Sequence, residues 1–156
     1  MNKTILPIKE VKSCNEIQLH YKRQLFDTMP HLNSVEESQR YLREIIDLQR
    51  IDLVEFFWVM YLTNSNRLIA MAEIGVGSTN LVAVSVKTIF QKALLVNATG
   101  IIVAHNHPSG NLNASDADIA MTKKIDQAAR VFEIVLIDHI IITSEGFLSF
   151  AKEGLL

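Results

Sequence analysis

The stretch GIIVAHNHPSGNLNASDAD, residues 100–118, places two histidines, a serine and an aspartate at the spacing His-x-His-x7-Ser-x2-Asp. Its apolar run 101–104 predicts a buried strand, and successive side chains of a strand point to opposite faces of a sheet. His105 and His107 therefore point to one face, with Cα atoms ~6.5–7 Å apart, so both imidazoles can reach one ion. The spacing predicts a metal site at the end of this strand.

The residues that follow predict a turn and then the start of a helix. Residues 108–110 end the strand, and Ser115 has the character of an N-cap for a helix beginning near Asp116. Asp118 then lies in the first turn, where its carboxylate can complete a His, His, Asp set, and a catalytic zinc takes three protein ligands. The alternative is that Ser115 and Asp118 form only a capping box. The coincidence of all these features favours the metal site.

Two other classes of metal enzyme are excluded by spacing. The letters His-Asn-His at 105–107 match the name of the HNH nucleases, but that name describes residues spread over a much longer element. Zinc deaminases need His-x-Glu followed by Pro-Cys-x-x-Cys. This chain has a single cysteine, Cys14, which also predicts a reducing compartment.

The pattern resembles the JAMM/MPN metalloprotease-like domains and, within them, the bacterial RadC group. The resemblance runs from about Val54 to Leu156, which is about two thirds of the chain. It is carried by the segments NRLIAMAEIGVGS, AHNHPSGNLNASDAD and LIDHIIITSEGFLSFAKEGLL.

The resemblance implies a role for each matched residue. His105, His107 and Asp118 would bind zinc. Ser115 would help to bind the water and stabilise the oxyanion. An upstream glutamate, matched by Glu73, would be the general base. The implied reaction is zinc-dependent hydrolysis of a peptide or isopeptide bond in a peptide or protein substrate.

Glu73 also stands out without the resemblance. It follows the apolar run 68–72, and a carboxylate buried at the end of a strand is costly unless it is paired. The alternative is a glutamate at a strand end that points into solvent. We expect the other glutamates to be less well placed, because they lie in the amino-terminal segment, at a strand start or after the motif: Glu10, Glu55, Glu133 and Glu145.

Strand and helix patterns alternate along the chain. We expect an extended segment at 4–11, helices at 34–48, 86–97 and 116–130, and strands at 56–62, 67–74, 82–84, 101–104, 134–143 and 147–150. Interleaved strands and helices indicate an α/β fold with a mixed central sheet. This agrees with the three-layer α-β-α architecture that the resemblance implies.

Length and composition suit one domain. A chain of 156 residues with 49% hydrophobic content can fill a single core. We expect an extended or irregular segment over residues 1–33 and the RadC-like domain over 34–156. No apolar run approaches the ~18 residues of a membrane span, and the start MNKTILPIKE lacks a signal-peptide pattern. We therefore expect a cytoplasmic protein.

Two residues interrupt the apolar strand predicted at 134–143. Asp138 and His139 need specific partners or an exposed edge, which is the ordinary structural interpretation. The alternative is that they support the metal site, because histidine ligands commonly donate their second N–H to a neighbouring group.

Charge argues against direct DNA binding. The net charge is −2 and no long basic run is present, whereas non-specific DNA binding needs Lys and Arg to neutralise phosphates. The hydrolase is the favoured function, with a link to DNA repair implied by the resemblance. The alternative is a metal-stabilised binding module in a DNA-processing or mobile-element assembly. A metal-dependent nuclease is a weaker third hypothesis, because such sites are usually rich in carboxylates.

Overall fold

The computed structural model describes residue 22 and residues 25–77 and 83–156. Five strands form one mixed sheet in the order β2-β1-β3-β4-β5. β1 is antiparallel to β2 and β3, β3 is parallel to β4, and β5 is antiparallel to β4. The strand bounds are Phe56–Leu62 for β1, Leu68–Val76 for β2, Gly100–Asn106 for β3, Val135–Ile142 for β4 and Phe147–Ser149 for β5.

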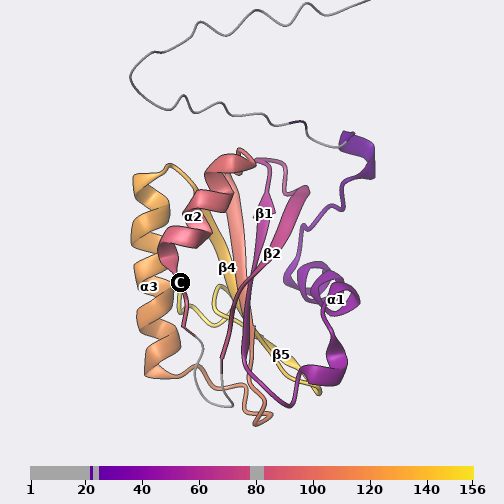
Figure 1. Cartoon of the computed structure of the whole chain (residues 1–156), viewed down its shortest axis with the longest axis vertical. Helices are drawn as coiled ribbons and strands as arrows, with labels where there is room; N and C mark the ends of the chain where they lie inside the picture. Colours follow the sequence, from indigo (N-terminus) through magenta and orange to yellow (C-terminus); the bar gives the residue numbers. More distant parts are fainter. Residues whose placement is uncertain (1–21, 23–24, 78–82) are drawn as a thin grey trace, which may run out of the picture.

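Helices cover both faces of this sheet (Figure 1). Helix α1, Val35–Ile45, lies on one face, and helices α2, Val86–Leu95, and α3, Asp116–Val131, lie on the other. Two 3-10 turns, Phe26–Thr28 and Leu48–Arg50, complete the helical elements of the described residues. The α/β class and the three-layer α-β-α arrangement are therefore confirmed.

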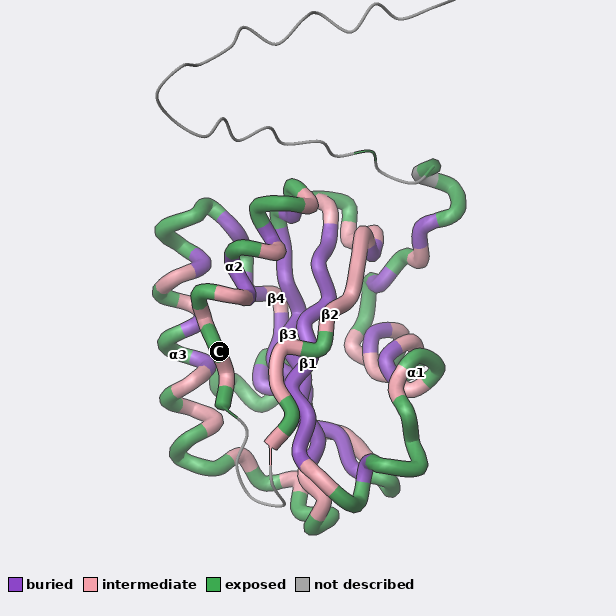
Figure 2. The backbone as a smooth tube through the Cα atoms, viewed as in Figure 1, coloured by how far each residue is buried: buried purple, intermediate pink, exposed green. Residues whose placement is uncertain are grey.

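The two central strands, β1 and β3, divide the core into two halves. Every residue of both strands is buried (Figure 2). Alternate residues serve opposite faces, so Val59 and Val103 pack under α2 and α3, whereas Met60 and Ile102 pack under α1. A strand buried on both faces is typically a continuous apolar run, which is the pattern of β1 and of residues 101–104 of β3.

Local signals fix most element bounds. The Ser34 side chain accepts a hydrogen bond from the Glu37 amide and caps α1. This helix is shorter than predicted, because Ile46 is already extended and the chain turns there into the Leu48–Arg50 segment. The hairpin between β1 and β2 is confirmed, as are the strands predicted near 134–143 and 147–150.

Other predictions fall wholly or partly on residues that are not described. The extended segment 4–11 and Cys14 lie outside the described residues, as does Val82. Ala83 and Val84 belong to no strand, so the described part of the strand predicted at 82–84 is wrong. The domain boundary at residue 34 stays a prediction. Within the described ranges, no helix has the length and apolar character that a bilayer crossing requires.

Candidate metal centre

The end of β3 and the start of α3 bring the predicted residues together. His105 is the last residue but one of β3, and His107 directly follows the strand. Ser115 is the N-cap of α3, and a complete capping box joins it to Asp118: each backbone amide donates to the other side chain, over 3.2 Å and 2.8 Å. The capping box is therefore present, and it holds the Asp118 carboxylate in place beside the strand, where Asp118 also faces the two histidines.

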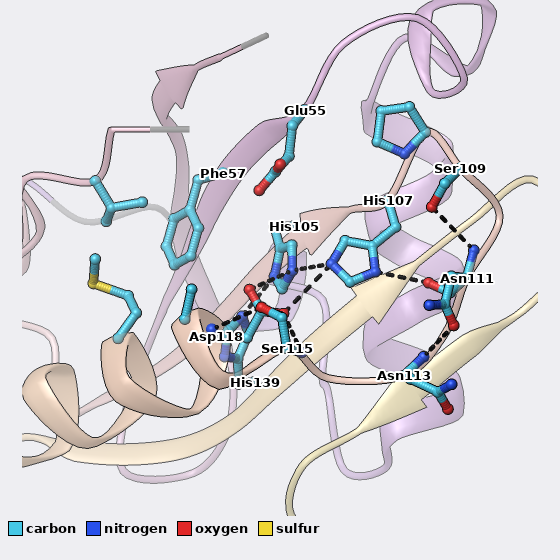
Figure 3. A pocket seen from close by; sticks show the side chains of 14 residues that line it. Glu55, Phe57, His105, His107, Ser109, Asn111, Asn113, Ser115, Asp118 and His139 are labelled. Carbon is cyan, nitrogen blue, oxygen red and sulfur yellow. Dashed lines mark hydrogen bonds and ion pairs between the residues drawn. The ribbon is translucent and has the colours of Figure 1, made fainter. Parts of the chain in front are cut away.

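Three potential ligand atoms converge at this point (Figure 3). The two Nε2 atoms of His105 and His107 lie 2.9 Å apart. Asp118 Oδ1 lies 3.2 Å from Nε2 of His105, and Oδ2 lies 3.5 Å from Nε2 of His107. The structure thus brings together all three predicted ligands, with ligand atoms within 4.8 Å of one another.

The outer nitrogen of His107 is fixed by the backbone. Its Nδ1 lies 2.7 Å from the carbonyl oxygen of Asn111. A carbonyl can only accept, so Nδ1 carries a hydrogen and donates it. In a neutral imidazole the other nitrogen is then bare, and Nε2 of His107 presents a lone pair to the site.

A longer chain of contacts fixes His105. Thr122 Oγ1 donates to the Asp118 carbonyl over 2.6 Å, and so it must accept from Nδ1 of His139, also 2.6 Å away. His139 is fully buried, and this burial, together with the nearby His105, holds its pKa well below the usual value, so it is neutral. Its Nε2 therefore accepts from Nδ1 of His105 over 2.8 Å. His105 Nε2 is left bare.

The consequence is a site made only of acceptors. Two imidazole lone pairs and one carboxylate face each other, an arrangement that a cation satisfies. A proton can take this role: the hydrogen bond to Asp118 raises the pKa of His107 despite its partial burial. Burial opposes ionisation of Asp118, but its hydrogen bonds to His105 and His107 outweigh that effect and hold its pKa below the usual value. Two imidazoles and a carboxylate fit zinc and related divalent metals.

His139 and its neighbour Asp138 have different roles. His139 supports the site through His105 and stacks on Phe150, with ring centroids 4.5 Å apart. Asp138 points away: it accepts hydrogen bonds from the Ser149 hydroxyl at 2.5 Å and the Ala151 amide at 3.0 Å. The support interpretation therefore applies to His139 and the structural interpretation to Asp138.

The three ligands line a pocket of about 290 Å³ that also contains Glu55. Glu55 directly precedes β1, is 9% exposed, and directs its carboxylate toward His105 and His107 (Figure 3). Burial raises its pKa, although the two nearby histidines oppose the shift. Apart from Asp118, Glu55 is the one carboxylate among the described residues that line this pocket.

Glu73 requires a correction, because the structure does not bring it to the metal centre. It lies exposed on β2, directly opposite Trp58 of β1, and Trp58 packs on the α1 face of the sheet. Glu73 lines a separate pocket with Asp47 and Arg50. From the sequence, Glu55 was expected to be less well placed than Glu73, because it lies at the start of a strand. A usable signal was present, since the alternation of an all-buried strand puts Glu55 on the same face as Phe57, which pairs with His105.

The sequence of this chain is similar to those of known proteins. A family model described as "RadC-like JAB domain" matches residues 32–155. A UPF0758 protein of Haemophilus influenzae is 35% identical over 147 residues, covering 94% of this chain and 65% of the relative. A UPF0758 protein of Flavobacterium johnsoniae is 44% identical, and the match covers 65% of this chain and 44% of the relative. A UPF0758 protein of Fusobacterium nucleatum is 41% identical, and the match covers 75% of this chain and 49% of the relative. The chain thus spans about half to two thirds of the length of these relatives.

Proposed function

Because this chain belongs to the family of RadC-like JAB domains, we propose that it is a zinc-dependent hydrolase of peptide or isopeptide bonds. One observation carries the proposal: the lone pairs of His105 and His107 and the Asp118 carboxylate converge, and a buried glutamate faces them across the same pocket. A binding module that used a metal only for stability would not need that glutamate.

The chain's own residues would hold the metal. His105, His107 and Asp118 would supply the ligand atoms, and the hydrogen bonds on the outer side of each imidazole fix its tautomer, so that in the neutral ring the inner nitrogen carries the lone pair. When bound, zinc supplies Lewis-acid chemistry, because it lowers the pKa of a water ligand and polarises a carbonyl group.

Glu55 is the proposed general base and acid. A carboxylate whose pKa is raised by burial is a stronger proton acceptor than an exposed one. Its oxygen atoms would take a proton from the attacking water and return it to the nitrogen of the leaving amine. The protonated state needed for the second transfer is the state that burial favours.

Ser115 is proposed to stabilise the oxyanion. Its hydroxyl lines the pocket and donates to Asp118 Oδ2 over 2.6 Å. A serine hydroxyl can rotate, so this hydrogen can turn from the carboxylate toward a substrate oxygen on which negative charge develops. The backbone half of the capping box would keep Asp118 in place during that rotation.

The proposed substrate is a peptide or protein. The net charge of −2 gives no support for direct nucleic-acid binding. An association with DNA-repair or mobile-element proteins remains a proposal about partners, separate from the chemistry of the pocket.

Metal content and turnover test this function together. We expect about one zinc per chain in the wild-type protein and none in His107→Ala or Asp118→Ala, measured by elemental analysis. Turnover should then be screened with peptide libraries and isopeptide-linked substrates. Glu55→Gln should keep the zinc and lose turnover, while Glu73→Gln, the same change on the opposite face, should keep both. A zinc-loaded wild type that cleaves no substrate in either class would favour the binding module.

A further inference from the structure

Asn106 lies between the two histidine ligands but serves the other face of the sheet. His105 and His107 point into the pocket, so the intervening side chain points to the α1 side. Asn106 is 0% exposed. A buried amide is stable only when its polar atoms have partners, and the identity of those partners shows what it holds.

All of its partners lie in one short segment that leads into β1. Asn106 Oδ1 accepts from the Phe56 amide over 2.7 Å. Its Nδ2 donates to the Ile51 and Val54 carbonyl oxygens over 2.6 Å and 2.8 Å. The Val54 carbonyl and the Phe56 amide belong to the two peptide groups that flank Glu55. One side chain therefore fixes the backbone on both sides of that glutamate.

The chemistry of this contact is specific to an amide. The segment offers one donor and two acceptors, and a carboxamide has one oxygen to accept with and two N–H groups to donate. Aspartate at this position could still accept from Phe56, but it would place an oxygen against two carbonyl oxygens. Leucine, of similar size, would leave all three backbone groups without their partner.

We infer that Asn106 is a positioning residue that sets the place of Glu55 opposite His105 and His107. This inference rests on the proposed hydrolase function for its catalytic consequence. The histidines and Asn106 are consecutive residues of one strand end, so any shift of the ligands would carry the Glu55 backbone with it. The same three residues thus place both the metal ligands and the proposed base.

Two variants separate this role from a general effect on folding. Asn106→Leu removes the three hydrogen bonds, and Asn106→Asp keeps only the one from Phe56. The matched control is Ile102→Ala, a buried position on the same strand and the same face, which pairs with Met60 of β1 and whose aliphatic side chain makes no hydrogen bond to the segment 51–56. If Asn106→Leu does not fold, Asn106→Asp carries the same turnover and zinc tests.

Three measurements are expected to agree. In Asn106→Leu the Phe56 amide should exchange its hydrogen at least about tenfold faster relative to the Val59 amide, because it has lost its acceptor. In both variants the zinc dissociation constant should stay within about threefold of wild type, since the ligands face the other way. The kcat should fall by up to about 100-fold with little change in KM, the effect of a base displaced by about 1 Å.

The outcomes distinguish this inference from the proposed function. If the wild type hydrolyses no substrate, amide exchange and the crystallographic position of the Glu55 carboxylate in the zinc-loaded Asn106 variants still decide the positioning role. Unchanged Phe56 exchange in Asn106→Leu, or an unmoved Glu55 carboxylate in the variants, would overturn it. The inference would also be overturned if the Asn106 variants lost as much zinc as His107→Ala, or if their kcat fell no more than that of Ile102→Ala.

Discussion

Glu55 and Glu73 are associated with neighbouring strands of one sheet but lie in opposite chemical surroundings. Glu55 is buried beside two histidines and an aspartate, under the face that α3 covers. Glu73 is exposed on the α1 face, in a pocket with Arg50 and Asp47. The face that each carboxylate occupies decides which side chains surround it, and burial on the α3 face raises the pKa of Glu55. Proximity along the chain to a motif does not decide these surroundings.

Removal of the carboxylate charge at each site gives the largest expected difference between Glu55 and Glu73. Glu55→Gln should lower kcat by about 100- to 10,000-fold, because it removes the proposed proton acceptor. Glu73→Gln should leave kcat within about twofold of wild type. Steady-state kinetics on any substrate that the wild type cleaves provide the measurement, with zinc content checked in each variant. Equal losses in the two variants would contradict the assignment of Glu55.

The hydrogen bonds that link Thr122 to His139 and His139 to His105 can be removed separately. Thr122→Val keeps the shape of the side chain but takes away the group that accepts from His139, so the His139 and His105 tautomers are no longer fixed. We expect zinc affinity to fall by about 10- to 100-fold, measured by competition with a chelator. Thr143→Val is the control, since Thr143 is also buried but its hydroxyl accepts from the Glu145 and Gly146 amides and not from a histidine. A similar loss of zinc in the control would refute the relay.

Proton competition offers a test that needs no substitution. The pKa of His107 is raised above its usual 6.5 by its hydrogen bond to Asp118. Zinc requires the neutral imidazole, so its affinity should fall about tenfold per pH unit once the pH drops below that raised value. For the metal-free protein the sign is opposite. The stability that protonated His107 contributes is present below pH 6.5 and is lost as the pH rises through the raised pKa.

Calorimetric zinc titrations and metal-free denaturation, each across pH, measure the two effects. An affinity independent of pH between about 5 and 8 would show that His107 is not a ligand, given its expected titration in that range.

The smallest expected effect is a change in stability at the pocket that Glu73 lines together with Asp47 and Arg50. The Arg50 guanidinium carbon sits 4.7 Å from the centre of the Phe56 ring, and Phe56 stacks on Trp58. Arg50→Ala should lower the free energy of unfolding by about 0.5–1 kcal/mol through loss of this cation–π contact at an exposed site. Urea denaturation measures it. Zinc affinity should not change, and a change would show that the two pockets are coupled.

The ligand set could be predicted from the sequence because it depends on local rules. Strand alternation pairs His105 with His107, and the N-cap at Ser115 fixes where Asp118 lies in the first turn. The layered fold followed from alternating strands and helices for the same reason. Each of these inferences needs only neighbours within a few residues.

The position of Glu55, the proposed base, could not be predicted in this way. Its place depends on the register between β1, β2 and β3, and the β1–β2 pairing shifts between Phe57 and Trp58. Such a bulge exchanges the faces of the residues beyond it, so the face of Glu73 cannot be read from alternation alone. The contacts of Asn106 with the segment that carries Glu55 span 50 to 55 residues and are equally invisible in a local pattern.

The position of β3 also bears on the order in which a metal would enter and leave. β3 is paired on both sides, by β1 and β4, so the backbone of His105 cannot move outward without breaking two ladders, and its side chain is 1% exposed. His107 and Asp118 are 16% and 14% exposed, and they border the loop 108–115. We therefore expect an arriving metal ion to meet His107 and Asp118 first and His105 last, and a departing ion to release them in the reverse order.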